Sequence, residues 1–227
     1  MSTSGTTSFA PDLTEIIEEA YARTGYIGRS GFDFRSARTS LNLVLSELAN
    51  HGINLWTVTS GTISLVPGTA TYNLPDDTVD LIEHVVRTTS GTSQTDLAIS
   101  RISVSTYASI PSKNNTGRPI QCYINRQSPT PTITLWPIPD SSTPYTLVYW
   151  RLRRLQDAGN GGNTQDVPFR FVPALIAGLA YHLAMKVPGG LERVAMLKAQ
   201  YDEALMLAEG EDRERAAVRF VPRVGRV

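Results

Sequence analysis

The sequence has one cysteine and three histidines among 227 residues. A single thiol excludes an intramolecular disulfide and argues against a cysteine-based zinc site. We therefore expect Cys122 to be a small buried residue in a strand. No two of His51, His84 and His182 have the i, i+3 or i, i+4 spacing of metal ligands on one helix. We interpret them as structural histidines, because a metal or acyl-transfer site would have to assemble from distant segments.

The chain also lacks net charge and long hydrophobic runs. Lys+Arg and Asp+Glu both number 21, so overall charge gives no support for binding to nucleic acid or to anionic membranes. The longest apolar run, residues 169–185, is interrupted by arginine, proline, glycine and histidine, and it is too short to span a bilayer. The first residues do not have the basic and then apolar pattern of a secretory signal. We therefore expect a soluble protein that is not exported and has no membrane partner.

Helical periodicity is present at both ends of the chain. The expected helices cover residues 11–25, 35–52, 167–189 and 191–217, with residues 26–34 as a loop. Asp12 is the expected N-cap of the first helix, and Glu15 completes a capping box. Because no single helix buries its apolar stripe alone, the helices from the two ends must pack on each other. The residues from 174 to 184 are rich in Ala and Gly, and we place them at the centre of this bundle.

Between the second and third helices, apolar residues alternate with polar ones at period two, which is typical of strands. Strands are expected at residues 56–64, 71–73, 78–88, 97–99, 119–125, 132–136 and 145–151. A short helical turn is expected near Ser103. Spacing near ten residues, with Pro, Gly and Asn in the turns, favours an antiparallel sandwich or barrel. Since this region is an insertion, its first and last strands should lie side by side.

The expected fold class is α+β: an antiparallel bundle of four main helices, an inserted antiparallel β-sandwich or barrel, and an extended C-terminal arm. The boundaries are residues 1–10 for a flexible N-terminus, 11–54 with 165–216 for the bundle, 55–156 for the β domain and 217–227 for the arm. Large side chains dominate small cores, so we expect five residues in the β core or at its border with the helices. These are Trp56, Tyr72, Leu74, Trp136 and Trp150.

No motif for catalysis or for a cofactor is present. The Gly-rich loop at residues 155–168 has neither the GKS/GKT ending of a P-loop nor the strand-to-helix context of a dinucleotide site. Residues 149–157 are basic and aromatic, a pattern that can bind nucleic acid. The alternative, which we favour at zero net charge, is that Trp150 and Leu152 face the core. The arginines of that stretch are then solvated or paired with acids on a neighbouring helix: Arg151, Arg153 and Arg154.

The order of several short stretches carries a resemblance. These are LANHGINLWTV, VPGTATYNLPDDTVDL, GRPIQCYINRQ, ITLWPIPD, YTLVYWRLRRLQDAG and VPFRFVPALIAGLAYHLA. In this order, over residues 13–223, the chain resembles the head-to-tail adaptor proteins of tailed bacteriophages, in particular the tail-tubular or head-completion proteins of short-tailed phages. No single stretch is chemically diagnostic.

The resemblance implies a virion protein, assembled in the host bacterial cytoplasm, that forms a ring at the head–tail junction, commonly of twelve subunits. The helices build the ring beneath the portal protein, and a C-terminal arm grips the portal. The β domain meets the next tail protein, a nozzle, hub or stopper. Genome DNA passes through the channel during ejection without sequence-specific contacts. The resemblance implies no catalytic residue and no cofactor.

The resemblance also assigns two sets of binding residues. The portal-binding set is Arg219, Phe220, Val221, Pro222, Arg223, Val224 and Arg226, and the docking set for the tail partner is Pro67, Gly68, Pro75, Asp76 and Asp77. Pro222 and Gly225 exclude a continuing helix in the arm. So short a segment buries too little area to offset its ordering entropy, and we expect it to be mobile in the free subunit. The alternative functions are a nucleic-acid-binding module and a virion-associated hydrolase.

Overall fold

A computed structural model of the chain describes residues 3–27, 30–52, 55–90 and 93–213. The chain divides into two compact units. The helical unit combines the N-terminal part, up to Asn50, with the C-terminal part from Asp157 onward. The β unit is the continuous stretch His51–Gln156.

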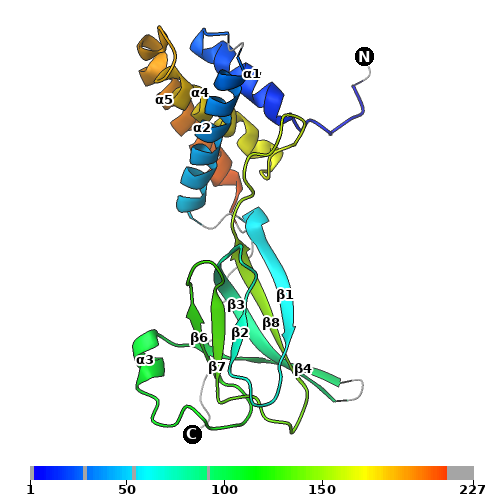
Figure 1. Cartoon of the computed structure of the whole chain (residues 1–227). Helices are drawn as coiled ribbons and strands as arrows, with labels where there is room; N and C mark the ends of the chain where they lie inside the picture. The colour runs from blue at the N-terminus through cyan, green and yellow to red at the C-terminus, as the bar shows by residue number, and fades with distance from the viewer. Residues whose placement is uncertain (1–2, 28–29, 53–54, 91–92, 214–227) are drawn as a thin grey trace, which may run out of the picture. The chain divides into compact units, whose positions relative to one another are not determined.

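Among the described residues, four α-helices build the helical unit, and all four are labelled in Figure 1. They are α1 (Leu13–Thr24), α2 (Gly31–Asn50), α4 (Val172–Ala184) and α5 (Val194–Glu211), with 3-10 turns η2 (Phe169–Phe171) and η3 (Gly190–Arg193). Helix α4 contacts each of the other three. The expectation that helices from the two ends of the chain pack on each other is confirmed.

Helix α1 begins at the predicted cap. The Asp12 carboxylate accepts the backbone N–H of Glu15 at 2.9 Å, and the Glu15 carboxylate accepts the backbone N–H of Asp12 at 3.1 Å. These two bonds pair donors that the first turn of a helix leaves unpaired. The buried face of α1 is an apolar stripe with Thr24 added at its end: Leu13, Ile16, Ile17, Ala20 and Tyr21.

Helix α2 begins four residues before the predicted start, so the loop prediction is wrong for residues 31–34. The Ser30 hydroxyl accepts the backbone N–H of Asp33, and the Asp33 carboxylate accepts the backbone N–H of Ser30, each at 3.1 Å. This second capping box starts the helix in a stretch whose glycine and aromatic residues do not indicate one. The spacing of Ser30 and Asp33 was the available signal.

Helix α4 is buried on nearly all sides. Pro173 is the exposed exception between Val172 and Ala180, and Leu183 and Ala184 are buried as well. This burial confirms the prediction that residues 174–184 lie at the centre of the bundle. The small side chains of α4 let neighbouring helices approach closely. No helix in the described part of the chain is both long and apolar enough to cross a membrane.

The described residues of the β unit form two four-stranded sheets, and Figure 1 labels all of their strands except β5. The first has the order β1-β8-β3-β4, and the second has the order β2-β7-β6-β5. The strands are β1 (Val58–Ser64), β2 (Thr71–Asn73), β3 (Thr78–Ser90), β4 (Ser93–Ala98), β5 (Ser100–Arg101), β6 (Gln121–Asn125), β7 (Thr132–Trp136) and β8 (Tyr145–Arg153). Every predicted strand overlaps one of them. A 3-10 turn, η1 (Leu55–Thr57), precedes β1.

The first and last strands of the β unit are neighbours, as expected. Strands β1 and β8 are antiparallel, and their pairing runs from Val58 opposite Leu152 to Ser64 opposite Thr146. The predicted helical turn near Ser103 is also confirmed. It is the short helix α3 (Val104–Ala108), and the Ser103 hydroxyl accepts the backbone N–H of Thr106 at 3.2 Å.

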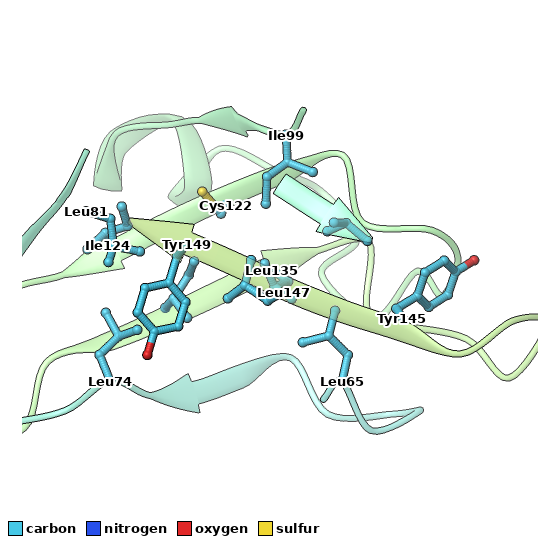
Figure 2. Packing of buried hydrophobic residues seen from close by; sticks show 12 residues of the cluster. Leu65, Leu74, Leu81, Ile99, Cys122, Ile124, Leu135, Tyr145, Leu147 and Tyr149 are labelled. Atoms are coloured by element: carbon cyan, nitrogen blue, oxygen red, sulfur yellow. The ribbon is translucent and has the colours of Figure 1, made fainter. Parts of the chain in front are cut away.

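Both sheets contribute to one apolar core. Figure 2 shows Leu147 and Tyr149 of β8 in this cluster together with Cys122 of β6 and Leu135 of β7. Cys122 is fully buried in a strand, as predicted. The core forms because alternate residues of each strand point to the same face.

The predicted core set is right only in part. Leu74 is 2% exposed, and Tyr72 packs against the core cluster. Trp56 and Trp136 are half-buried. Trp150 is 38% exposed, so the interpretation that it faces the core is wrong. Its neighbour Tyr149 is the buried one, and alternation turns Trp150 to the opposite face of the sheet.

The expected fold class, a bundle of four main helices with an inserted antiparallel sandwich or barrel, is wrong. The described residues form five α-helices and two four-stranded sheets, a mixed α+β arrangement. Helix α3 belongs to the β unit, and β5 pairs in parallel with β6, with Ser100 opposite Gln121. Parallel neighbours need a crossover rather than a hairpin, and the α3 segment provides it. The expected arm, residues 217–227, lies outside the described residues.

Candidate interaction surfaces

The first predicted docking turn, Pro67–Gly68, lies between β1 and β2. Gly68 has φ +81°, a conformation that side chains with a Cβ rarely adopt. Its N–H donates to the carbonyl of Pro139 at 2.9 Å, which joins the turn to the loop between β7 and β8. The N–H of Thr69 donates to the carbonyl of Val66 at 3.1 Å. These bonds define the shape of the turn.

A tyrosine from β2 supports this turn. The Tyr72 hydroxyl accepts the backbone N–H of Val66 at 2.9 Å. The same hydroxyl lies 2.9 Å from the carbonyl of Thr69 and 3.1 Å from that of Val66, so it can donate its one proton to either. Burial raises the pKa of Tyr72, which keeps this proton in place. The turn is therefore held in shape before any partner arrives.

Replacing Tyr72 by phenylalanine tests this support. We expect Tyr72→Phe to lower the free energy of unfolding by about 0.5–1.5 kcal/mol, because the turn loses the hydroxyl that bonds Val66 and Thr69 while the exposed N–H of Val66 can bond to water instead. Urea unfolding followed by circular dichroism measures the change. Tyr107→Phe is the matched control, because the Tyr107 hydroxyl has no hydrogen bond within the described residues. Equal stability of Tyr72→Phe and the wild type would contradict the assignment.

The second predicted docking turn, Pro75–Asp77, lies between β2 and β3, and its carboxylates are already bonded. Thr130 donates its hydroxyl to Asp76 at 2.7 Å. Arg151 forms two bonds to Asp77, at 2.5 and 3.2 Å, and these lower the pKa of that carboxyl group. The Asp77 carbonyl accepts the N–H of Arg154 at 2.7 Å. This turn therefore anchors the end of β8.

The same contacts bear on the basic segment at residues 149–157. The Arg151 side chain is only 14% exposed and is paired with Asp77. The pairing of this arginine with an acid was expected, but the acid is on a turn of the β unit rather than on a helix. The guanidinium group of Arg151 therefore forms an ion pair within the β unit.

The structure does not bring the two docking turns together. The backbone N–H of Leu65, just before the first turn, bonds to Tyr145 at the start of β8. Thr78, just after the second turn, pairs with Arg153 at the end of β8. Eight strand steps separate these two partners, about 26 Å. The second turn is at the end where the chain enters and leaves the β unit, and the first is at the far end.

The far end of the β unit carries a cluster that sequence reasoning missed as a whole. We call residues 65–70, 109–120 and 137–144 the distal loop surface. The carbonyl and N–H of Ile138 bond to Gly117 and Asn115, both at 2.8 Å. The indole N–H of Trp136 donates to the carbonyl of Ser112 at 3.0 Å. Only the Pro, Asn and Ser content of these stretches indicated loops, and their pairing depends on the sheets.

One contact in the β core joins a cysteine to a histidine, residue types that serve elsewhere as nucleophile and general base. The Cys122 sulfur lies 3.1 Å from Nε2 of His84, and both residues are buried. Burial raises the pKa of Cys122 to about 12 and lowers the pKa of His84. The thiol is therefore kept protonated, the opposite of what thiolate chemistry needs. This pair is part of the core packing.

The predicted portal-binding residues, from Arg219 to Arg226, all lie outside the described residues.

Comparison with known proteins gives a match at the level of a family. A sequence profile described as SU10 adaptor protein matches residues 11–223, a span that includes both units. No curated protein matches the chain.

Proposed function

The chain belongs to the SU10 adaptor protein family, and from this membership we propose that it is a structural adaptor at the head-to-tail junction of a tailed bacteriophage. The observation that carries the proposal is a single family match over both units of the chain. An adaptor of this kind is a virion component that associates with other head or tail proteins. It acts by binding, and it needs no catalytic residue.

We further propose that copies of the chain form a ring, of about twelve subunits on the resemblance described above, beneath the portal. In this arrangement the helical unit builds the ring, and residues 219–226 bind the portal. Genome DNA passes through the channel without sequence-specific contacts. Alternating arginine and apolar side chains support the portal contact, because guanidinium groups can bond carboxylates at two points.

For the next tail protein we propose the distal loop surface, with Pro67 and Gly68 at its tip. Its loops are joined by hydrogen bonds, and it exposes the apolar residues Val66 and Ile120, which are 56% and 44% exposed. The carboxylates of Asp76 and Asp77, in contrast, already have partners. We therefore assign the Pro75–Asp77 turn a structural role. A prearranged surface lowers the ordering cost of binding.

The test is the native mass of the protein, alone and mixed with purified portal rings of the same phage. The proposal expects a complex with about a dozen copies of the chain on each portal ring. A monomer that ignores portal rings but retards DNA at low salt would instead favour the nucleic-acid-binding alternative. A monomer that ignores portal rings and cleaves peptidoglycan would favour the hydrolase.

A further inference from the structure

The helical unit has a groove between α1 and the start of α4, with a volume of about 660 Å³. Its floor is apolar and includes Ala22, Val172 and Ile176. A second hollow of about 450 Å³ lies between α4 and α5 and shares Arg23 and Pro173 with the first. Together they form one trough over α4, which we call the α4 trough.

The walls of the α4 trough are acidic. Glu15, Glu18 and Glu19 line it from α1, and Glu203 lines it from α5. Arg23 is the one basic residue among the lining residues, and it is paired with Glu19 at 2.9 Å. Within the described residues, Glu18 and Glu203 have no ion-pair partner. An apolar floor with acidic walls suits a segment that is apolar and basic.

The described chain ends beside this trough. The carboxylate of Asp212, directly after α5, is paired with the guanidinium of Arg170. Arg170 is two residues before Val172, which lines the trough. The segment that follows Arg213 therefore starts close to one end of the α4 trough.

The sequence of that following segment has the complementary chemistry. Residues 214–227 contain four arginines and one glutamate, and residues 218–227 contain no acid. Since the whole chain is neutral, the rest of it has three more acids than bases. Fourteen fully extended residues reach about 46–50 Å. The trough wall from Glu15 to Arg23 spans eight helical steps, about 12 Å, so the segment is long enough.

We propose that residues 214–227 bind in the α4 trough of their own chain in the free protein, in place of the mobile arm that the sequence alone led us to expect. Phe220 and Val221 cover the apolar floor, and the arginines face the acidic walls. The start of the segment beside the trough gives it a high effective concentration there, which favours its own chain over a second copy. This proposal does not rest on the proposed function, since it concerns the isolated protein. A partner that binds the same segment would have to displace it.

The test uses a cysteine pair in the full-length chain, Ala22→Cys with Val221→Cys. Cys122 is fully buried and stays out of thiol exchange. After mild oxidation, we expect most chains to form the disulfide within one chain. Under denaturing conditions they should run as single chains whose intact mass is lower by two hydrogen atoms. The matched control is Thr39→Cys with Val221→Cys, because Thr39 is exposed on α2 and does not line the trough. The control pair should cross-link several-fold less.

Equal cross-linking in the two pairs overturns the proposal, and disulfide-linked dimers assign the trough to the segment of a second copy. Charge provides an independent measurement. Glu18→Lys with Glu203→Lys should reduce the yield of the disulfide between positions 22 and 221 several-fold. Glu192→Lys, at an exposed site that lines neither hollow, should not. A yield that is insensitive to both changes also contradicts the proposal.

Discussion

Deletion of residues 218–227 is expected to leave the chain folded and to remove most of its binding to portal rings. The deleted residues carry three arginines and no acid, with Phe220, Val221 and Val224 between them. An extended segment of this kind can bind through its backbone, place apolar side chains in pockets and pair its guanidinium groups with carboxylates. We expect a loss of tenfold or more in affinity, about 1.4 kcal/mol or more.

Sedimentation of the truncated protein with portal rings measures this loss, and thermal unfolding reports whether the fold is intact. A full-length variant separates charge from chain length: Arg219→Glu, Arg223→Glu and Arg226→Glu in one protein. It should lose binding nearly as strongly as the truncation. Full-strength binding by the truncated protein would refute the assignment of residues 219–226 to the portal contact.

Replacing Gly178 by leucine is expected to lower the free energy of unfolding of the helical unit by about 1–3 kcal/mol. A Cβ atom at Gly178 lies 2.9 Å from Cε2 of Tyr201 and 3.2 Å from Cγ1 of Val44. Tyr201 is 1% exposed and Val44 is fully buried, so neither side chain can move into solvent. The added atoms therefore push α4 away from α5 and α2, which contact it on two sides.

Differential scanning calorimetry measures this change. The chain has two units, so two transitions are possible, and the shift should be confined to one of them. Gly210→Leu is the matched control, because Gly210 lies within α5 and a Cβ atom added there would have nothing within 4 Å. There the same substitution should not destabilise the chain, because it adds a helix-favouring side chain near the end of α5 without a clash. An unchanged melting temperature for Gly178→Leu would show that the packing at α4 is looser than described.

Much of the local structure followed from the sequence alone. The Asp12–Glu15 capping box and the helical turn near Ser103 were predicted because each depends on residues within one or two turns of the chain. The strands were predicted because alternation is visible within a few residues. The pairing of β1 with β8 followed from the placement of a β insertion between helices. The family was indicated by the order of short stretches along the chain.

The sites depend on contacts between distant residues, and there the tertiary structure decided. Strand register turns Tyr149 inward and Trp150 outward, a choice that alternation alone leaves open, because a shift of one residue reverses every side chain. Register also separates the two turns that the sequence grouped into one docking surface. The α4 trough needs α1, α4 and α5 packed together, and the pair between Arg170 and Asp212 places the chain end beside it. Periodicity shows which residues of a helix or strand share a face. Only long-range packing determines which faces and which ends of these elements meet.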